Sequence, residues 1–124
     1  MCLTLDKHSK RTKAEEDIAC YKIVTMSLSG CYYTYYQGIR INIGETYDSY
    51  LRKYKSDFGS KVEEGLHSFK ELKDARYFQS LRSWSFIIKC VIPKGSWYYE
   101  GFFGAEKSYA SNKLKYIEVV ENDL

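Results

Sequence analysis

Residue types that could bind an anionic ligand gather around a histidine near the middle of the chain. The stretch GLHSF places His67 beside Ser68, and Glu71 follows the serine at the S-x-x-E spacing of a helix capping box. Free amides and the positive end of the helix dipole favour phosphate at such a position. His67 and Ser68 are therefore candidate ligand-binding residues. The alternative is that Ser68 only caps the helix while His67 packs or faces solvent.

A second candidate set lies in the tyrosine-rich stretch CYYTYYQGIR, residues 31–40. If strict strand alternation runs through it, the odd-numbered residues from Tyr33 to Ile43 form one core face. Tyr36 and Arg40 then lie on the opposite face, where a ring and a guanidinium could hold a stacked base and its phosphate. The alternative is an ordinary cross-strand surface ladder.

The third set comes from the C-terminal part of the chain. Lys94 and Trp97 flank a glycine turn, and Asn112 and Lys113 precede the last predicted strand. The indole could stack a base, the lysines could hold phosphate, and the amide could bind polar edges. Together with the first two sets, they complete the predicted ligand-binding residues.

Several classes of chemistry lack their sequence signature. No P-loop, GxGxxG, HExxH or nucleophile elbow occurs, so we assign no catalytic residue, cofactor or metal. Cys2, Cys20, Cys31 and Cys90 form no CxxC pair, and Cys90 lies in an apolar run typical of inert core. We interpret all four as reduced thiols, with a disulfide between Cys20 and Cys31 as the alternative.

Length and charge limit the organisation and the partners. A chain of 124 residues fits one domain, which we place at residues 18–124, after a flexible N-terminal arm at residues 1–17. The formal charge of +3 and pI of about 8.6, with lysines interleaved among acids, argue against nucleic acid as a partner. No leader segment or long apolar run is evident, which predicts a cytoplasmic protein without membrane contact.

The pattern of elements predicts an α+β fold. Residues 18–25 and 83–92 have strand composition, and residues 114–120 form a closing strand. Apolar residues at helical spacing after the capping box predict one main helix at about residues 68–79. Residues 51–61 are predicted to cross the surface, and the segment FFGAEKSYASN, residues 102–112, is predicted as a glycine-containing loop that follows a short strand, SWYYEG. The expected architecture is a twisted, mainly antiparallel sheet of about six strands with that helix.

Three segments resemble a family of small proteins from gut bacteria and their phages, to which no activity is assigned. They are EEGLHSFKELKDA, IIKCVIPKGSWYYEG and SYASNKLKYIEVV, which share the family's G-x-H step, IPKG turn and Y-x-S-x-K stretch. This resemblance implies an accessory protein of a phage or mobile element.

The same order of segments resembles the catalytic half of mono-ADP-ribosyltransferases. The place of their catalytic glutamate reads Ser111-Asn112-Lys113 in this sequence, and Glu106 is the nearest acid. Their serine-containing middle motif falls near His67 and Ser68. The resemblance implies a nucleotide-shaped pocket that has lost its transferase chemistry.

The leading hypothesis is non-enzymatic binding of an anionic, nucleotide-like small molecule, including sequestration of a signalling nucleotide as an anti-defence sponge. One alternative is an enzyme acting on NAD, with His67 and Glu106 or Glu100 as catalytic groups. Another is an inhibitor of a host protein that acts through an exposed Phe102–Phe103 pair and the basic arm. A homo-oligomer is compatible with aromatic-rich edge strands.

Overall fold

The protein is built almost entirely from β-strands. The computed structural model describes residues 3–6, 9–35, 38–56 and 59–120. Of these residues, 59% lie in strands and 8% in a helix. In chain order the elements are β1 (Leu3–Leu5), β2 (Thr12–Lys13), β3 (Ile18–Met26), β4 (Tyr32–Thr34), β5 (Arg40–Ile41), β6 (Thr46–Asp48), β7 (Arg52–Ser56), β8 (Gly59–Glu64), β9 (Leu66–Phe69), α1 (Leu72–Ser80), β10 (Ser85–Ile92), β11 (Trp97–Phe103), β12 (Glu106–Ser111) and β13 (Lys113–Val120).

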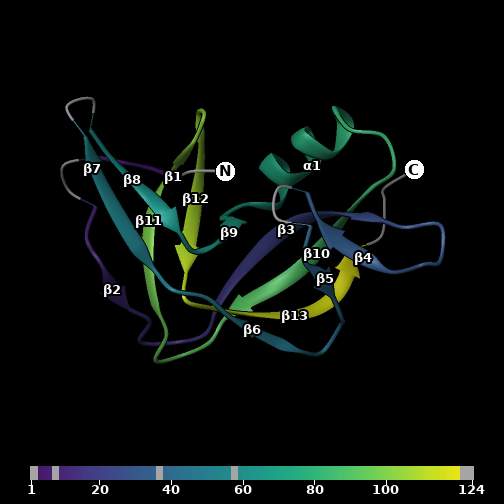
Figure 1. Cartoon of the computed structure of the whole chain (residues 1–124), viewed down its shortest axis with the longest axis horizontal. Coiled ribbons are helices and arrows are strands. Elements are labelled where there is room, and N and C mark those ends of the chain that lie inside the picture. The colour runs from purple at the N-terminus through teal and green to yellow at the C-terminus, as the bar shows by residue number, and fades with distance from the viewer. Residues whose placement is uncertain (1–2, 7–8, 36–37, 57–58, 121–124) are drawn as a thin grey trace.

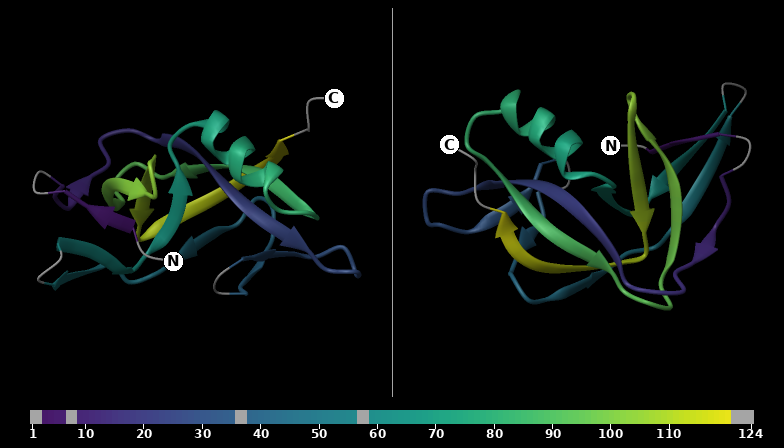
Figure 2. Two further views of the ribbon diagram at one scale, coloured as in Figure 1. Left: turned by 90° about the horizontal axis from the view of Figure 1, so that it is seen from above. Right: turned by 180° about the vertical axis from the view of Figure 1, so that it is seen from behind.

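One continuous sheet of antiparallel pairs connects these strands (Figure 1). Its order is β6-β13-β10-β3-β9-β12-β11-β1-β8-β7, while β2 pairs with β11 and the β4–β5 hairpin pairs with β3. The sheet curls into a half-barrel, and α1 lies over the half that contains β3 and β10 (Figure 2). Curling buries side chains on the inner face of the sheet, and α1 covers part of its outer face.

The predicted α+β class with about six strands is wrong. Residues 51–61 were expected to cross the surface as a loop, but they contribute to the β7–β8 hairpin, which pairs with β1. The segment FFGAEKSYASN, expected as a loop, contains the end of β11 and all of β12, which form a hairpin with its turn at Gly104. These polar or glycine-containing segments become strands because Val62 and Tyr99 bury in a common cluster with β1.

The helix starts later than its capping pattern predicts. It runs from Leu72 to Ser80, with Glu71 in the N-cap position and no side-chain cap. Ser68 belongs instead to β9, where it is fully buried and pairs with Tyr109 of β12. Burial of all four β9 residues outweighs the local capping preference, which stabilises a helix by only about 1 kcal/mol.

The described residues of the predicted N-terminal arm pack into the sheet. Leu3 and Leu5 are 2% and 6% exposed, and they lie in a cluster with Val62 and Tyr99. Further along, β2 pairs with β11, and Ala14 is 2% exposed. The alternating apolar residues of LTL were too few to reveal a strand from sequence, because their partners lie far along the chain.

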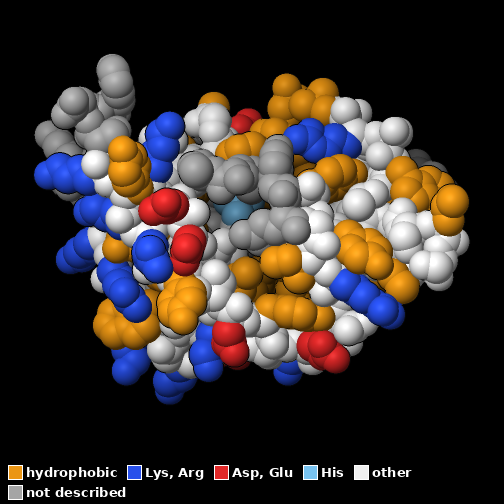
Figure 3. Space-filling view, in the orientation of Figure 1, with side chains coloured by type: hydrophobic (Ala, Val, Ile, Leu, Met, Phe, Trp, Pro, Cys, Tyr) orange, Lys and Arg blue, Asp and Glu red, His pale blue; other side chains and the backbone are white. Residues whose placement is uncertain are grey.

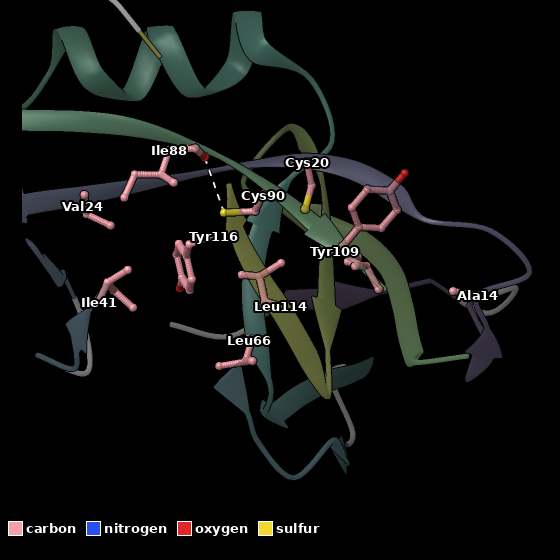
Figure 4. Packing of buried hydrophobic residues seen from close by; sticks show 11 residues of the cluster. Ala14, Cys20, Val24, Ile41, Leu66, Ile88, Cys90, Tyr109, Leu114 and Tyr116 are labelled. Carbon is pink, nitrogen blue, oxygen red and sulfur yellow. Dashed lines mark hydrogen bonds between the residues drawn. The ribbon is translucent and has the colours of Figure 1, made fainter. Parts of the chain in front are cut away.

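The largest hydrophobic cluster fills the inside of the half-barrel (Figure 4). Tyr116 and Leu114 of β13 lie there beside Cys20 of β3, Cys90 of β10 and Leu66 of β9. Cys20 and Cys90 are paired in register across β3 and β10, and both are fully buried. The interior of this half is therefore closed by packed side chains.

The predicted core face from Tyr33 to Ile43 is not continuous. Of its isoleucines, only Ile41 is buried, whereas Ile39 and Ile43 are 42% and 41% exposed. Turns with positive φ at Gly38 and Gly44 interrupt the alternation on either side of the short β5 strand. Tyr36 lies outside the described residues, and Arg40 is exposed.

Truncating Leu3 tests whether the start of the chain is part of the core. We expect Leu3→Ala to lower the free energy of unfolding by roughly 2–5 kcal/mol, because it leaves a cavity against Val62. Thr4→Ala, on the exposed face of the same strand, should change it by less than about 0.5 kcal/mol. Chemical denaturation measures both, and equal small effects would mean that β1 contributes no packing.

Candidate functional site

A cavity of about 60 Å³ opens where the two halves of the sheet meet beneath α1. Here β3 and β9 share a single register pair, Tyr21 with Phe69, so the strands diverge beyond it. The cavity is lined by Lys22, Ile23, Thr34, Tyr35, Gly65, His67, Phe69, Phe78, Arg82 and Phe103. The lining therefore combines two cations, polar groups and an aromatic wall.

Lys22 extends from the middle of β3 into this cavity. Its Nζ donates a hydrogen bond of 2.7 Å to the backbone oxygen of His67. No carboxylate among the described residues lies within ion-pair distance of it. Desolvation by burial lowers the pKa of Lys22 from 10.5 to about 8. An anion bound here would be stabilised by the ammonium and would in turn favour its protonated form.

His67 of β9 forms part of the cavity floor and is 9% exposed. Its ring meets Phe69 and Phe103 edge to face, with centroids 5.0 and 5.3 Å away. Burial, and then the positive charge of Lys22, hold the pKa of His67 well below 6.5, so the imidazole is neutral. Its Nε2 is buried and has no hydrogen-bond partner among the described residues.

The opposite side of the cavity is aromatic and cationic. Phe78 of α1 stacks on Phe69 at 5.1 Å, and its ring lies 5.3 Å from that of Phe103. The guanidinium of Arg82, just after the helix, lies 5.4 Å from the Tyr35 ring. The Tyr35 hydroxyl is buried without a partner among the described residues. Figure 3 shows the face that Figure 1 presents, with orange apolar side chains above and below its centre.

The described lining of the cavity supplies cations and hydrogen-bonding groups. The same described lining contains no carboxylate and no thiol. Cys20 and Cys90 are buried in the core, where desolvation raises the pKa of Cys20 to about 11 and that of Cys90 well above 9. Neither thiol is therefore available as a thiolate nucleophile at neutral pH.

Glu100 and Glu106, the predicted catalytic acids of an enzyme acting on NAD, do not lie with His67 in the cavity. Glu100 pairs with Lys70 at 3.0 Å, and neither Glu100 nor Glu106 lines the cavity. Phe102 and Phe103 point to opposite faces of β11 because they are adjacent in a strand. Phe103 packs on His67 and Phe78, so the two rings do not form one exposed pair.

The predicted binding residues fall into separate places. His67 lines the cavity, whereas its neighbour Ser68 points to the other face of β9 and is fully buried. Arg40 is exposed on β5, in register with Tyr33. Tyr36 belongs to the undescribed part of the chain, so the predicted cradle that it forms with Arg40 cannot be placed.

The four C-terminal candidates lie outside the cavity. The Oδ1 atom of Asn112 accepts a 2.9 Å hydrogen bond from the backbone nitrogen of Trp97, so this amide is structural. Lys113 pairs with Asp48 at 3.8 Å. The backbone nitrogen of Lys94 donates to the Asp17 carboxylate at 2.8 Å, while its side chain is exposed.

Sequence reasoning missed Lys22, Tyr35 and Arg82. The available signal was Lys22 itself, since it stands between Cys20 and Val24 on the inward face of a predicted strand. A lysine at an inward position of an apolar strand is rare unless it has a partner or a function. Arg82 could not be found in this way, because its approach to Tyr35 depends on how α1 packs.

Comparison of the chain with protein-family models, with curated proteins and with solved structures gives no match. The fold and the geometry therefore carry the functional argument. Among the described residues, no group of three or more His, Cys, Asp or Glu side chains is arranged to hold a metal ion. The helix that the structure describes is too short to cross a bilayer.

The depressed pKa of Lys22 predicts a measurable pH dependence. Between pH 8 and 10.5 the unfolded chain still binds a proton that the folded chain has released, so Lys22 makes stability rise with pH. The contribution is at most about 1.4 kcal/mol per pH unit. Cys20 and Cys90, whose pKa values are raised, make stability fall with pH over the same range. We therefore compare the wild type with Lys22→Met, which keeps both cysteines. Denaturation across pH 7–10 should show the wild type gaining stability relative to the variant; parallel curves would contradict a desolvated amine.

Proposed function

We propose that this protein binds a small anionic molecule, with the anionic group in the cavity between β3 and β9. The observation that carries the proposal is the lining itself: a desolvated lysine without a described carboxylate partner faces a neutral histidine whose Nε2 is unpaired among the described residues. Burial of such groups is costly unless a partner is supplied. A bound oxyanion would supply acceptors to the lysine, the imidazole and the Tyr35 hydroxyl together.

The size of the cavity limits what enters it. About 10–15 Å³ of such volume holds one water molecule, so about 60 Å³ accommodates a few waters or one small oxyanion. A whole nucleotide does not fit. A phosphate or carboxylate group would enter, and the rest of the ligand would lie at the mouth near Arg82 and Phe78. A flat ring there would meet a guanidinium and an aromatic face, which favours nucleotide-like molecules over aliphatic acids.

A narrower form of the proposal follows from the resemblance to phage and gut-bacterial proteins. In that form the ligand is a signalling nucleotide, and the protein sequesters it without converting it. The resemblance supports a role in a phage or mobile element, whereas the cavity supports only the anionic class of the ligand.

A thermal-shift screen tests the proposal directly. The probes are inorganic phosphate, pyrophosphate, mononucleotides, NAD, ADP-ribose, and cyclic di- and trinucleotides, at pH 7. A ligand at a hundredfold its Kd should stabilise by about 2.7 kcal/mol, which corresponds to several degrees in Tm. Lys22→Met should weaken binding at least about tenfold, because it removes the buried charge but keeps a side chain of similar length.

The matched control is Lys115→Met, which removes an exposed lysine of β13 outside the cavity. It should leave the shift unchanged. Affinity should also fall as the pH rises above 8, since the free protein then loses the ammonium. A flat screen, or equal losses in both variants, would refute the proposal.

A further inference from the structure

A second concave surface, which we name the β2 groove, lies at the other end of the molecule. It has a volume of about 840 Å³ and is formed by β2 with its flanking residues and by the turn before β11. Its described lining consists of Lys10, Arg11, Thr12, Lys13, Ala14, Glu15, Lys94 and Gly95. None of these residues lines the cavity between β3 and β9, so the two sites are separate.

Backbone hydrogen bonds fix the walls of the β2 groove. The nitrogen of Ala14 donates to the oxygen of Ser96 at 2.8 Å, and the nitrogen of Gly95 donates to the oxygen of Ala14 at 2.8 Å. Asp17 holds the turn through the backbone nitrogen of Lys94. The side chains of the groove therefore stand on a rigid frame, which lowers the entropy cost of placing them against a ligand.

The charge of the molecule is concentrated in this groove. Four of its lining side chains are basic and one, Glu15, is acidic. The resulting net charge equals the +3 of the whole chain, so the rest of the protein is balanced. Glu16 and Asp17 do not line the groove, although the Asp17 carboxylate accepts a hydrogen bond from the backbone nitrogen of Lys94 at its turn. A concave basic surface raises the local concentration of polyanions.

An aromatic ring adjoins the cations. Trp97 is 37% exposed, and the guanidinium of Arg11 lies 5.2 Å from the centre of its ring. Lys13 is paired with Trp97 across β2 and β11. A half-exposed indole between two basic side chains can stack an unpaired base while the cations contact its flanking phosphates.

More basic residues lie on the same side of the molecule. Lys53, Lys55 and Lys61 are exposed on the β7–β8 hairpin, and in Figure 3 blue side chains gather along the edge where β2, β7 and β8 lie in Figure 1. Glu63 and Glu64 interrupt this surface, and Glu64 pairs with Arg52 at 3.8 Å. The proposed site is therefore limited to the β2 groove, whose described lining includes no residue of the hairpin.

We propose that the β2 groove binds single-stranded nucleic acid, with Lys10, Arg11, Lys13 and Lys94 contacting phosphates and Trp97 stacking a base. Single strands are favoured over duplexes because stacking on the indole needs an unpaired base. The proposal does not depend on the cavity or on its ligand.

Fluorescence anisotropy with labelled oligothymidylate and oligouridylate of about 12 nucleotides tests this assignment, since single-strand sites span roughly 4–16 nucleotides. Four phosphate contacts predict about a 50-fold loss of affinity between about 50 and 200 mM salt. Lys13→Glu with Lys94→Glu should weaken binding at least tenfold. The matched control, Lys73→Glu with Lys115→Glu, changes the net charge equally at exposed sites outside the groove and should weaken it less than threefold.

Trp97→Ala separates stacking from simple charge attraction. It should weaken oligonucleotide binding about tenfold but leave binding of inorganic polyphosphate unchanged, while Trp97→Phe should restore most of the affinity. Lys22→Met should have no effect on oligonucleotides. Circular dichroism confirms folding of each variant. The proposal is overturned by no binding at 50 mM salt, by equal losses in the groove and control variants, or by an unaltered affinity in Trp97→Ala.

Discussion

The hydrogen bond from the Lys22 amine to the His67 carbonyl joins the two halves of the sheet at a junction that has a single register pair. On one side, β3 pairs with β10 over its length from Ile18 to Thr25, whereas β3 and β9 share a single register pair. A longer β3–β9 ladder would close the gap and remove the cavity. An apolar residue at position 22 would leave the His67 carbonyl without this donor. Lys22 thus donates a hydrogen bond to a β9 carbonyl at the point where β3 and β9 diverge. It also places an amine in the cavity between these strands.

Packing around this hydrogen bond places Lys22 and His67 in an apolar environment. On the inner face the neighbours of Lys22 are Cys20 and Ile88, both fully buried. On the outer face Phe69, Phe78 and Phe103 form an aromatic wall beneath α1. The low polarity of both sides depresses the pKa values of both bases. Such an environment strengthens any interaction with a bound anion.

Strands with long apolar runs could be predicted from the sequence, and those formed by distant pairing could not. The prediction of a strand at residues 18–25 is confirmed by β3, and that of a central strand ending before Pro93 is confirmed by β10. The S-x-x-E pattern misplaced the helix start because β9 is buried by pairing with β12, which lies about 40 residues further along the chain, beyond the reach of a local capping rule. His67 was selected as a helix-terminal residue, yet it reaches the cavity from a strand. Its partners Lys22 and Arg82 come from β3 and from beyond α1, so only the fold brings them together.

The distribution of charge over the surface, like the pairing of distant strands, could not be predicted from the sequence. A formal charge of +3 spread over 124 residues gives almost no field, and on that basis the sequence argued against polyanionic partners. Folding places the acids of residues 15–17 at different positions, with Asp17 turned toward the backbone of Lys94. The β2 groove keeps four cations close together and leaves the balanced remainder elsewhere. Because electrostatic attraction is screened beyond about 10 Å at moderate salt, a nearby anion would respond to this local group of cations more than to the total charge.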